Sequence, residues 1–204
     1  MKTISFGLAV LAAMVISGCA TTPIENLPDN VKLSAPGRMG QQTVEVITFE
    51  REGPAKQNLA TCAAMNIENN SVTLSNDTSF VGAFTGNYYH GRSEKVVGGG
   101  STLQAQDGET GVVVASGAEE YSKSGLIPIA SVVRFKALLA PLEDRTVVQF
   151  KNIEVAQKST GSIPNSGFSP LGSWTGSYTM DAYGAMERVA ESILDCAHGA
   201  SIVD

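Results

Sequence analysis

The spacing of apolar and polar residues changes several times along the chain, and each change predicts a structural element. Residues 43–49 are rich in β-branched and aromatic side chains, which favours a strand. A valine run bounded by glycines at 111–117 indicates a second, buried strand. Residues 131–139 and 145–155 are two apolar segments joined by a turn at 141–144, and they make the clearest predicted hairpin.

The last part of the chain has a helical period instead. Between Asp181 and His198 an apolar stripe recurs at spacings of three and four residues, which predicts an amphipathic helix. Asp181 is its expected N-cap and Gly199 its expected C-cap. The stripe consists of Met186, Val189, Ala190, Ile193, Cys196 and Ala197. We therefore expect an α+β fold, an antiparallel sheet with the C-terminal amphipathic helix packed on one face.

Residues 54–67 do not decide between a helix and a strand. Pro54 could open a helix with Leu59 and Cys62 on one face. Alternatively, residues 61–67 form a strand that turns into the next apolar segment. Both interpretations stay open at this point.

The N-terminus has the pattern of a secretory signal peptide. Lys2 precedes an uncharged run from Ile4 to Ile16, and Ser17 and Gly18 supply small residues at its end. The run is too short to cross ~30 Å of hydrocarbon at about 1.5 Å per residue.

The sequence Ile16-Ser17-Gly18-Cys19 resembles the lipobox of bacterial lipoproteins. That resemblance implies a diacylglycerol on the Cys19 thiol, cleavage before Cys19 and acylation of the new amine. Ala20, and not aspartate, follows the cysteine, which in such lipoproteins implies sorting to the outer membrane. We therefore expect a protein anchored by lipid on the periplasmic side of the outer membrane, with the inner membrane as the alternative.

Three segments follow from these patterns. Residues 1–18 are the signal peptide, residues 19–41 a lipidated N-terminus and flexible tether, and residues 42–204 a single α+β domain. The tether is expected because this stretch holds three prolines and little apolar surface. The order of segments in the domain resembles that of small uncharacterised envelope lipoproteins, a resemblance that carries over no activity.

Cys62 and Cys196 are the two cysteines besides Cys19. A pair of cysteines in an oxidising compartment predicts a disulfide. Cys196 lies on the apolar stripe of the predicted helix, so the bond would fasten that helix to the beginning of the domain. The alternative is two unpaired buried thiols, which pack as small apolar residues.

Composition and motifs narrow the possible chemistry. The chain carries 14 basic and 20 acidic residues, a net charge of −6, and no basic cluster, which argues against nucleic-acid partners. No metal-binding, serine-acylation or phosphate-loop motif occurs, so we assign no catalytic, cofactor or metal residue. His90 and His198 are expected at the surface, and Gly98-Gly99-Gly100 at a bulge or bend of a strand.

Two aromatic groups remain as candidates for binding. Tyr88 and Tyr89 lie near a predicted turn with Phe84, and Trp174 lies in a loop rich in serine and glycine. They either contact a partner or cover the end of the sheet as core. We expect a non-enzymatic protein that interacts with another envelope component. The alternative is a ligand-binding module for a peptidoglycan or glycan fragment, and the third hypothesis is a hydrolase without a recognisable motif.

Overall fold

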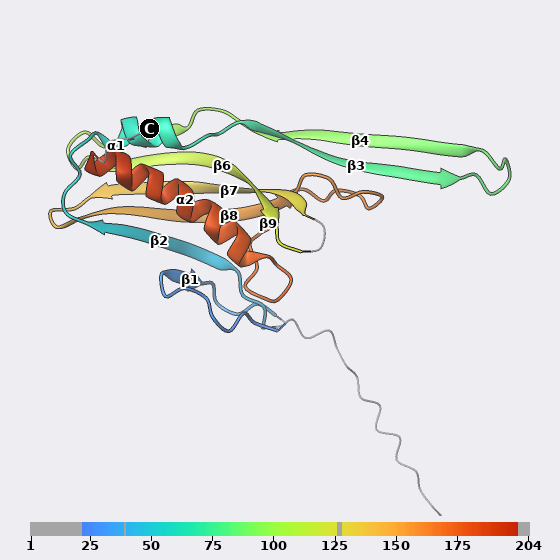
Figure 1. Ribbon diagram of the computed structural model, residues 1–204, viewed down its shortest axis with the longest axis horizontal. Helices are drawn as coiled ribbons and strands as arrows, with labels where there is room; N and C mark the ends of the chain where they lie inside the picture. The colour runs from blue at the N-terminus through green and yellow to red at the C-terminus, as the bar shows by residue number, and fades with distance from the viewer. Residues whose placement is uncertain (1–21, 39, 126–127, 200–204) are drawn as a thin grey trace, which may run out of the picture.

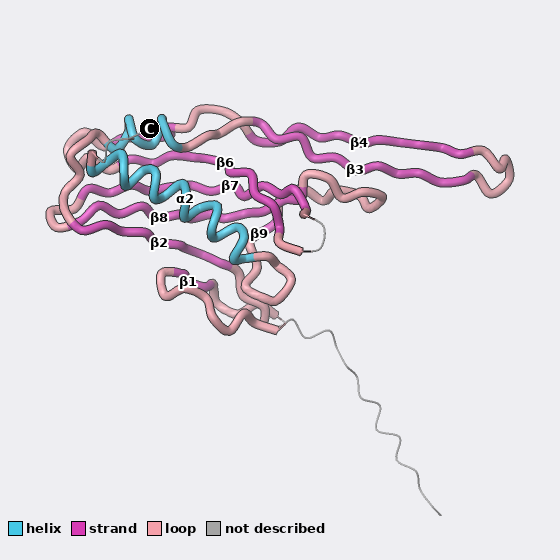
Figure 2. The backbone as a smooth tube through the Cα atoms, in the orientation of Figure 1, coloured by secondary structure: helices cyan, strands magenta, loops and turns pink. Residues whose placement is uncertain are grey.

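The computed structural model describes residues 22–38, 40–125 and 128–199. The predicted signal peptide, residues 1–18, and the predicted lipid-attachment residue Cys19 lie outside these residues. The fold is α+β, as the sequence predicted: a largely antiparallel sheet with two helices, one of them C-terminal (Figures 1 and 2). The elements in chain order are β1 (Val31–Leu33), β2 (Val44–Glu52), α1 (Leu59–Asn66), β3 (Ser71–Val81), β4 (Tyr88–Gly98), β5 (Leu103–Gln106), β6 (Val113–Lys123), β7 (Ile129–Pro141), β8 (Arg145–Gln157), β9 (Ser169–Pro170) and α2 (Thr179–His198).

The main sheet has the order β1-β2-β8-β7-β6-β5, and β9 pairs with β8. All of its described pairings are antiparallel. The predicted hairpin of residues 131–155 is β7–β8, closed by a hydrogen bond from the Leu142 N–H to the Arg145 carbonyl (2.8 Å). Because β7 and β8 are central strands, their alternate side chains are buried along nearly their whole length.

Helix α2 packs against this sheet. Its buried side chains form one continuous core with those of β2, β6, β7 and β8. The predicted apolar stripe is buried except for Cys196, which is half-buried, and Gly199 ends the helix in the left-handed conformation, as predicted. The predicted N-cap was wrong. The helix begins at Thr179, because the buried Thr179 hydroxyl donates to the Gly172 carbonyl and fixes the chain before Asp181.

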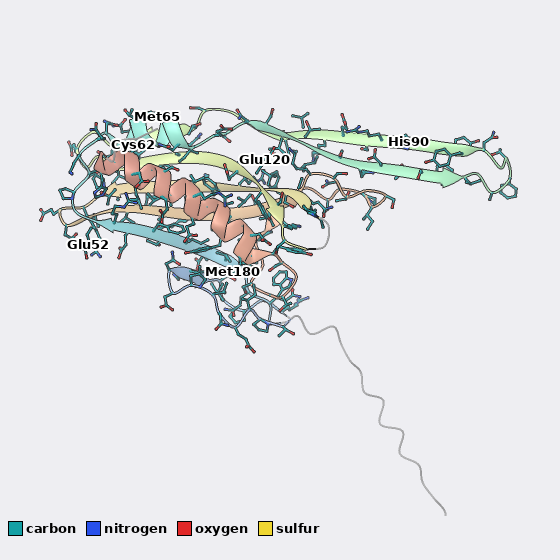
Figure 3. The ribbon with its side chains drawn as sticks, viewed as in Figure 1. Glu52, Cys62, Met65, His90, Glu120 and Met180 are labelled. Atoms are coloured by element: carbon teal, nitrogen blue, oxygen red, sulfur yellow. A yellow bond between two sulfur atoms is a disulfide. The ribbon has the colours of Figure 1, made fainter. Side chains whose placement is uncertain are left out.

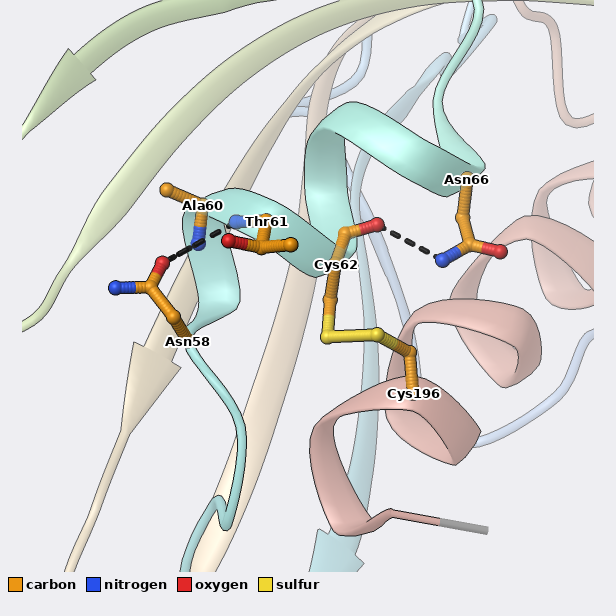
Figure 4. Close-up of a disulfide and its surroundings, with 6 residues drawn as sticks. All are labelled: Asn58, Ala60, Thr61, Cys62, Asn66 and Cys196. Carbon is orange, nitrogen blue, oxygen red and sulfur yellow. Dashed lines mark hydrogen bonds between the residues drawn. A yellow bond between two sulfur atoms is a disulfide. The ribbon is translucent and has the colours of Figure 1, made fainter. Parts of the chain in front are cut away.

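Residues 59–66 form a helix, which decides between the two alternatives for this stretch. The Asn58 side chain caps α1 by accepting from the N–H groups of Ala60 (2.8 Å) and Thr61 (3.2 Å) (Figure 4). Cys62 on α1 and Cys196 on α2 form a disulfide with a Cα–Cα distance of 5.6 Å, which is the predicted pairing. The bond joins the two helices at the C-terminal end of α2.

The described part of the predicted tether, residues 22–38 and 40–41, belongs to the domain, so that prediction was wrong there. β1 pairs with β2 at the edge of the sheet, and Val31 and Leu33 pack against the core. The prolines of this segment do not prevent the pairing, because β1 is only three residues long and contains no proline. Edge strands, moreover, have backbone groups free for such a pairing.

Strands β3 and β4 form a separate two-stranded hairpin, which we call the arm. Only its base is buried: Val72 and Leu74 of β3 pack on Val132 of β7 and Ala156 of β8. Beyond the base the arm extends past the end of the main sheet (Figure 1). Among the described residues, no helix combines the length and the apolar character needed to cross a membrane.

Candidate functional site

The far end of the arm carries a group of solvent-exposed apolar side chains. We call residues 80–89 the arm tip. No charged residue occurs in it. The group consists of Phe80, Val81, Phe84, Tyr88 and Tyr89. Phe84 is fully exposed, and the other four side chains are between 42% and 68% exposed. Aromatic side chains bury 150–250 Å² each when they are covered, so this tip offers a large binding contribution to a partner.

The arm tip has a defined conformation that its own residues produce. The Gly82 N–H donates to the Asn87 carbonyl (2.8 Å), and the Gly86 N–H donates to the Gly82 carbonyl (2.9 Å). Position 82 needs glycine, because a Cβ there would lie 2.5 Å from the Thr85 hydroxyl and 2.9 Å from the Tyr89 ring. The Thr85 and Tyr89 hydroxyls lie 3.3 Å apart. The tip is therefore a compact turn that presents its aromatic rings.

Phe80 and Tyr89 are cross-strand partners within the tip. Their rings stack with centroids 5.1 Å apart and planes 18° apart. The sequence pointed to Tyr88 and Tyr89 as binding candidates but not to Phe80. The missing signal was the register of the hairpin, which pairs Phe80 with Tyr89 across the turn.

Charged residues lie on the shaft of the arm, between its tip and its base. Arg92 of β4 lies 3.9 Å from the Asp77 carboxylate of β3 and 2.8 Å from the Glu94 carboxylate. His90 is exposed, as expected, and lies beside them on β4 (Figure 3). These exposed charges keep the shaft solvated and discourage unspecific pairing along it.

Trp174 does not join Tyr88 and Tyr89. It is half-buried, and it pairs with Pro23 in an isolated antiparallel bridge. Its ring lies over Gly172, where an added Cβ would come within 2.5 Å of the indole. The two aromatic groups are therefore separate in the structure, because backbone pairing to the N-terminal segment fixes Trp174 on the body.

A second candidate site is a concave region on the main sheet, beside the glycine run Gly98-Gly99-Gly100. It has a volume of about 510 Å³, and the side chains that line it include Asn69, Ser116, Arg134, Lys136, Asn152 and Glu154. Arg134 is engaged, with its Nε 2.8 Å from the Glu154 carboxylate and the Phe168 ring 4.1 Å from its guanidinium carbon. Asn152 has a positive φ of 52°, at the point where the β7–β8 register shifts. Strand β4 ends at Gly98, and Gly98, Gly99 and Gly100 all have positive φ, consistent with a bend.

His198 was expected at the surface, but the structure places it in a half-buried position. Its Nε2 lies 3.1 Å from the Thr146 hydroxyl. Burial lowers the pKa of His198, and the nearby Arg51 and Lys56 charges lower it further, while Asp195 opposes them. Thr146 is completely buried, so its hydroxyl holds the imidazole against the body of the domain. Within the described ranges no group of three or more metal-ligating side chains occurs.

Comparisons with known proteins add little to this geometry. No family model and no curated protein matches the sequence. The crystal structure of a DUF4468 family protein from Bacteroides ovatus is similar with a TM-score of 0.37 and 10% sequence identity, over 78% of this chain and 81% of that one. A similarity this weak carries no inference about family or function.

Proposed function

We propose that this chain is a non-enzymatic bacterial lipoprotein, anchored through Cys19 on the periplasmic side of the outer membrane, that binds another envelope protein through the arm tip. The lipobox-like sequence at Cys19 supports the anchor. The Cys62–Cys196 disulfide suits an oxidising compartment such as the periplasm.

One observation carries the binding role: an uncharged, aromatic turn held away from the body on two eleven-residue strands. Exposed aromatic side chains are costly to keep in water and dominate binding energy when they are covered. The Phe80–Tyr89 stack and the turn hydrogen bonds already order the tip, which lowers the entropy cost of binding.

The chemistry of the arm favours a protein over a glycan as the partner. The outer edge of β3 pairs with residues 158–161 as far as Asp77. Beyond Asp77, β3 and β4 are both edge strands of a two-stranded sheet, with backbone groups directed away from the hairpin. A protein strand can pair with such an edge while its side chains cover the aromatic rings. A glycan offers no matching backbone ladder.

Site-specific photocrosslinking in intact cells tests this function. A photoreactive residue at position 84 should capture one defined protein, and Tyr88→Ser in the same chain should remove that adduct. The control is position 65, where Met65 is 68% exposed and lies on α1 (Figure 3). Equal adducts from positions 65 and 84, or an adduct that survives Tyr88→Ser, would contradict binding by the tip.

The anchor has its own test. Cys19→Ser removes the thiol that would accept lipid, so the protein should leave the membrane fraction or stay unprocessed. A processed Cys19→Ser protein that still associates with the membrane would contradict the lipoprotein assignment.

A second candidate function is binding of a peptidoglycan or glycan fragment in the concave region of the main sheet. We propose that α2 covers one face of the sheet and leaves the other to this region. Lys136, Asn152 and Ser116 would offer polar groups to a ligand. Titration of soluble muropeptides should then show binding that Lys136→Ala weakens. The control Lys95→Ala, which changes a lysine on the arm, should leave this binding unchanged.

A further inference from the structure

The N-terminal segment is fixed to the body from its first described residue. The Thr175 N–H donates to the Thr22 carbonyl (2.8 Å), and the Ile24 N–H donates to the Ser173 carbonyl (3.0 Å). Pro23 lies between them, in its bridge with Trp174. The described chain is therefore fixed to the domain from Thr22 onward.

Thr22 lies only three positions after Cys19 in the sequence. Whatever conformation the intervening residues adopt, three residues span at most about 10–11 Å. The polar headgroup layer of a bilayer is roughly 5–8 Å thick on each side. If Cys19 carries lipid, as in the proposed function on which this step rests, Thr22 must lie at or just above the headgroups.

The surface around Thr22 has the chemistry of a membrane interface. A shallow depression of about 550 Å³ is lined by residues that include Pro23, Ile24, Tyr178 and Met180, and we call these four the anchor corner. Met180 and Tyr178 are 44% and 36% exposed. The Lys123 ammonium lies 5.1 Å from the centroid of the Tyr178 ring. Tyrosine and lysine at the edge of an apolar surface are typical of residues that sit at the headgroup level.

The backbone at the corner gives a second, independent observation. Tyr178 has φ 56° and ψ 36°, a left-handed conformation that a bulky residue rarely adopts. Strained residues of this kind persist only where the surrounding structure holds them, and they cluster at functional sites. Here the strained residue lines the depression beside Thr22, with 36% of its surface exposed.

We infer that the anchor corner rests on the headgroup layer of the bilayer that holds the lipid anchor, so that the domain lies flush on the membrane. Glu25 and Asp181 border the depression, and Asp181 accepts hydrogen bonds from the Ser124 backbone and hydroxyl. Because these carboxylates would not favour an anionic surface, the contact depends on apolar and aromatic groups. It should form on zwitterionic phospholipid.

The chain's single tryptophan reports on this contact. Trp174 is the bridge partner of Pro23 and lies at the corner. The lipidated protein, reconstituted in phosphatidylcholine vesicles, is compared with and without nitroxide-labelled headgroups. We expect a marked loss of Trp174 emission with headgroup labels and a smaller loss with labels deep in the acyl chains.

Two variants sharpen the measurement. A flexible Gly/Ser spacer of about 20 residues inserted between Cys19 and Thr22 adds a mean span of about 25 Å, and it should abolish most of the quenching. Tyr178→Asn tolerates the left-handed backbone and removes the ring, so it should reduce the quenching while leaving the thermal unfolding midpoint near that of the parent.

The outcomes separate the two proposals. Mass spectrometry that finds no lipid on Cys19, with no flotation on vesicles, would overturn both the anchor and the flush contact. A lipidated, vesicle-bound protein with Trp174 emission unaffected by headgroup labels would overturn the flush contact alone. Equal quenching with and without the spacer would also overturn it, because the contact would then not depend on the short link to Cys19.

Discussion

The rings of Phe80 and Tyr89 stack across the arm tip at a centroid distance of 5.1 Å while Phe80 stays 61% exposed and Tyr89 42% exposed. A stack of this kind stabilises the turn locally, by about 0.5–1.5 kcal/mol beyond area burial. It contributes little to the core, because the buried residues of the arm lie at its base.

Tyr89→Ser should therefore loosen the tip without unfolding the domain. We expect faster amide exchange in residues 82–88 and a change in global unfolding free energy within about 0.5 kcal/mol. Phe84→Ser is the matched control, since it removes a fully exposed ring that is not in the stack. Both variants should lose partner binding, but only Tyr89→Ser should change amide exchange in the tip. Global unfolding in either variant would contradict an independent tip.

The Cys62–Cys196 disulfide closes a sequence separation of 134 residues and joins α1 to α2. On the chain-entropy account a loop of this size stabilises the fold by about 4–5 kcal/mol, and measured bonds often give less. The double change Cys62→Ala and Cys196→Ala should lower the unfolding free energy by about 2–5 kcal/mol, measured by denaturant titration.

Reduction of the parent protein provides the matching control, because it opens the same loop without changing a side chain volume. Amide exchange should rise first at the C-terminal end of α2, where Cys196 lies. Equal stability of the oxidised and reduced protein would show that apolar burial alone holds the helix.

Tyr178 in the left-handed conformation allows a comparison of two substitutions at one position. Both Tyr178→Gly and Tyr178→Ala remove the ring and its contact with Lys123. Only glycine adopts this backbone without a steric cost of about 1–2 kcal/mol. The glycine variant should therefore be more stable than the alanine variant by about 1 kcal/mol in denaturant unfolding. A more stable alanine variant would mean that the left-handed backbone is not retained.

His198 should give the fold a pH dependence near neutrality. Its folded-state pKa lies below its ordinary value of 6.5, mainly through burial, then through Arg51 and Lys56, with Asp195 acting in the opposite direction. The unfolded chain then binds more protons than the folded one just below pH 6.5, so stability rises with pH through that window. The stabilisation is fully present above this pH and is lost as the pH falls toward the folded-state pKa.

The measurement is the unfolding free energy at a series of pH values from 5 to 8, for the parent and for His198→Gln. Glutamine can still accept from or donate to the Thr146 hydroxyl, but it does not titrate. The unfolding free energy should rise less steeply with pH in the variant, in the pH range between the folded-state and unfolded-state pKa of His198. An unchanged slope would exclude His198 as its source.

Much of the central fold was predictable because its signals are local. The β7–β8 hairpin follows from two apolar segments around a turn, and α2 follows from one apolar stripe that ends at a glycine. The Cys62–Cys196 pairing followed from the cysteine count together with the compartment that the N-terminus implied. Each of these features was predicted either from the spacing of apolar residues in a short segment or from the number of cysteines in the chain.

The tertiary structure alone decided the features that depend on distant partners. Residues 22–38 lie on the domain because β2 had a free edge, and α2 begins at Thr179 because Gly172 offers a buried carbonyl. At residues 59–66 the sequence was compatible with both a helix and a strand, and the helix is the form whose buried face packs into the core. The separation of Trp174 from Tyr88 and Tyr89 has the same origin, since pairing across long sequence distances sets which exposed aromatics lie together. A local pattern specifies which face of a segment is apolar, but only the assembled sheet determines what covers that face.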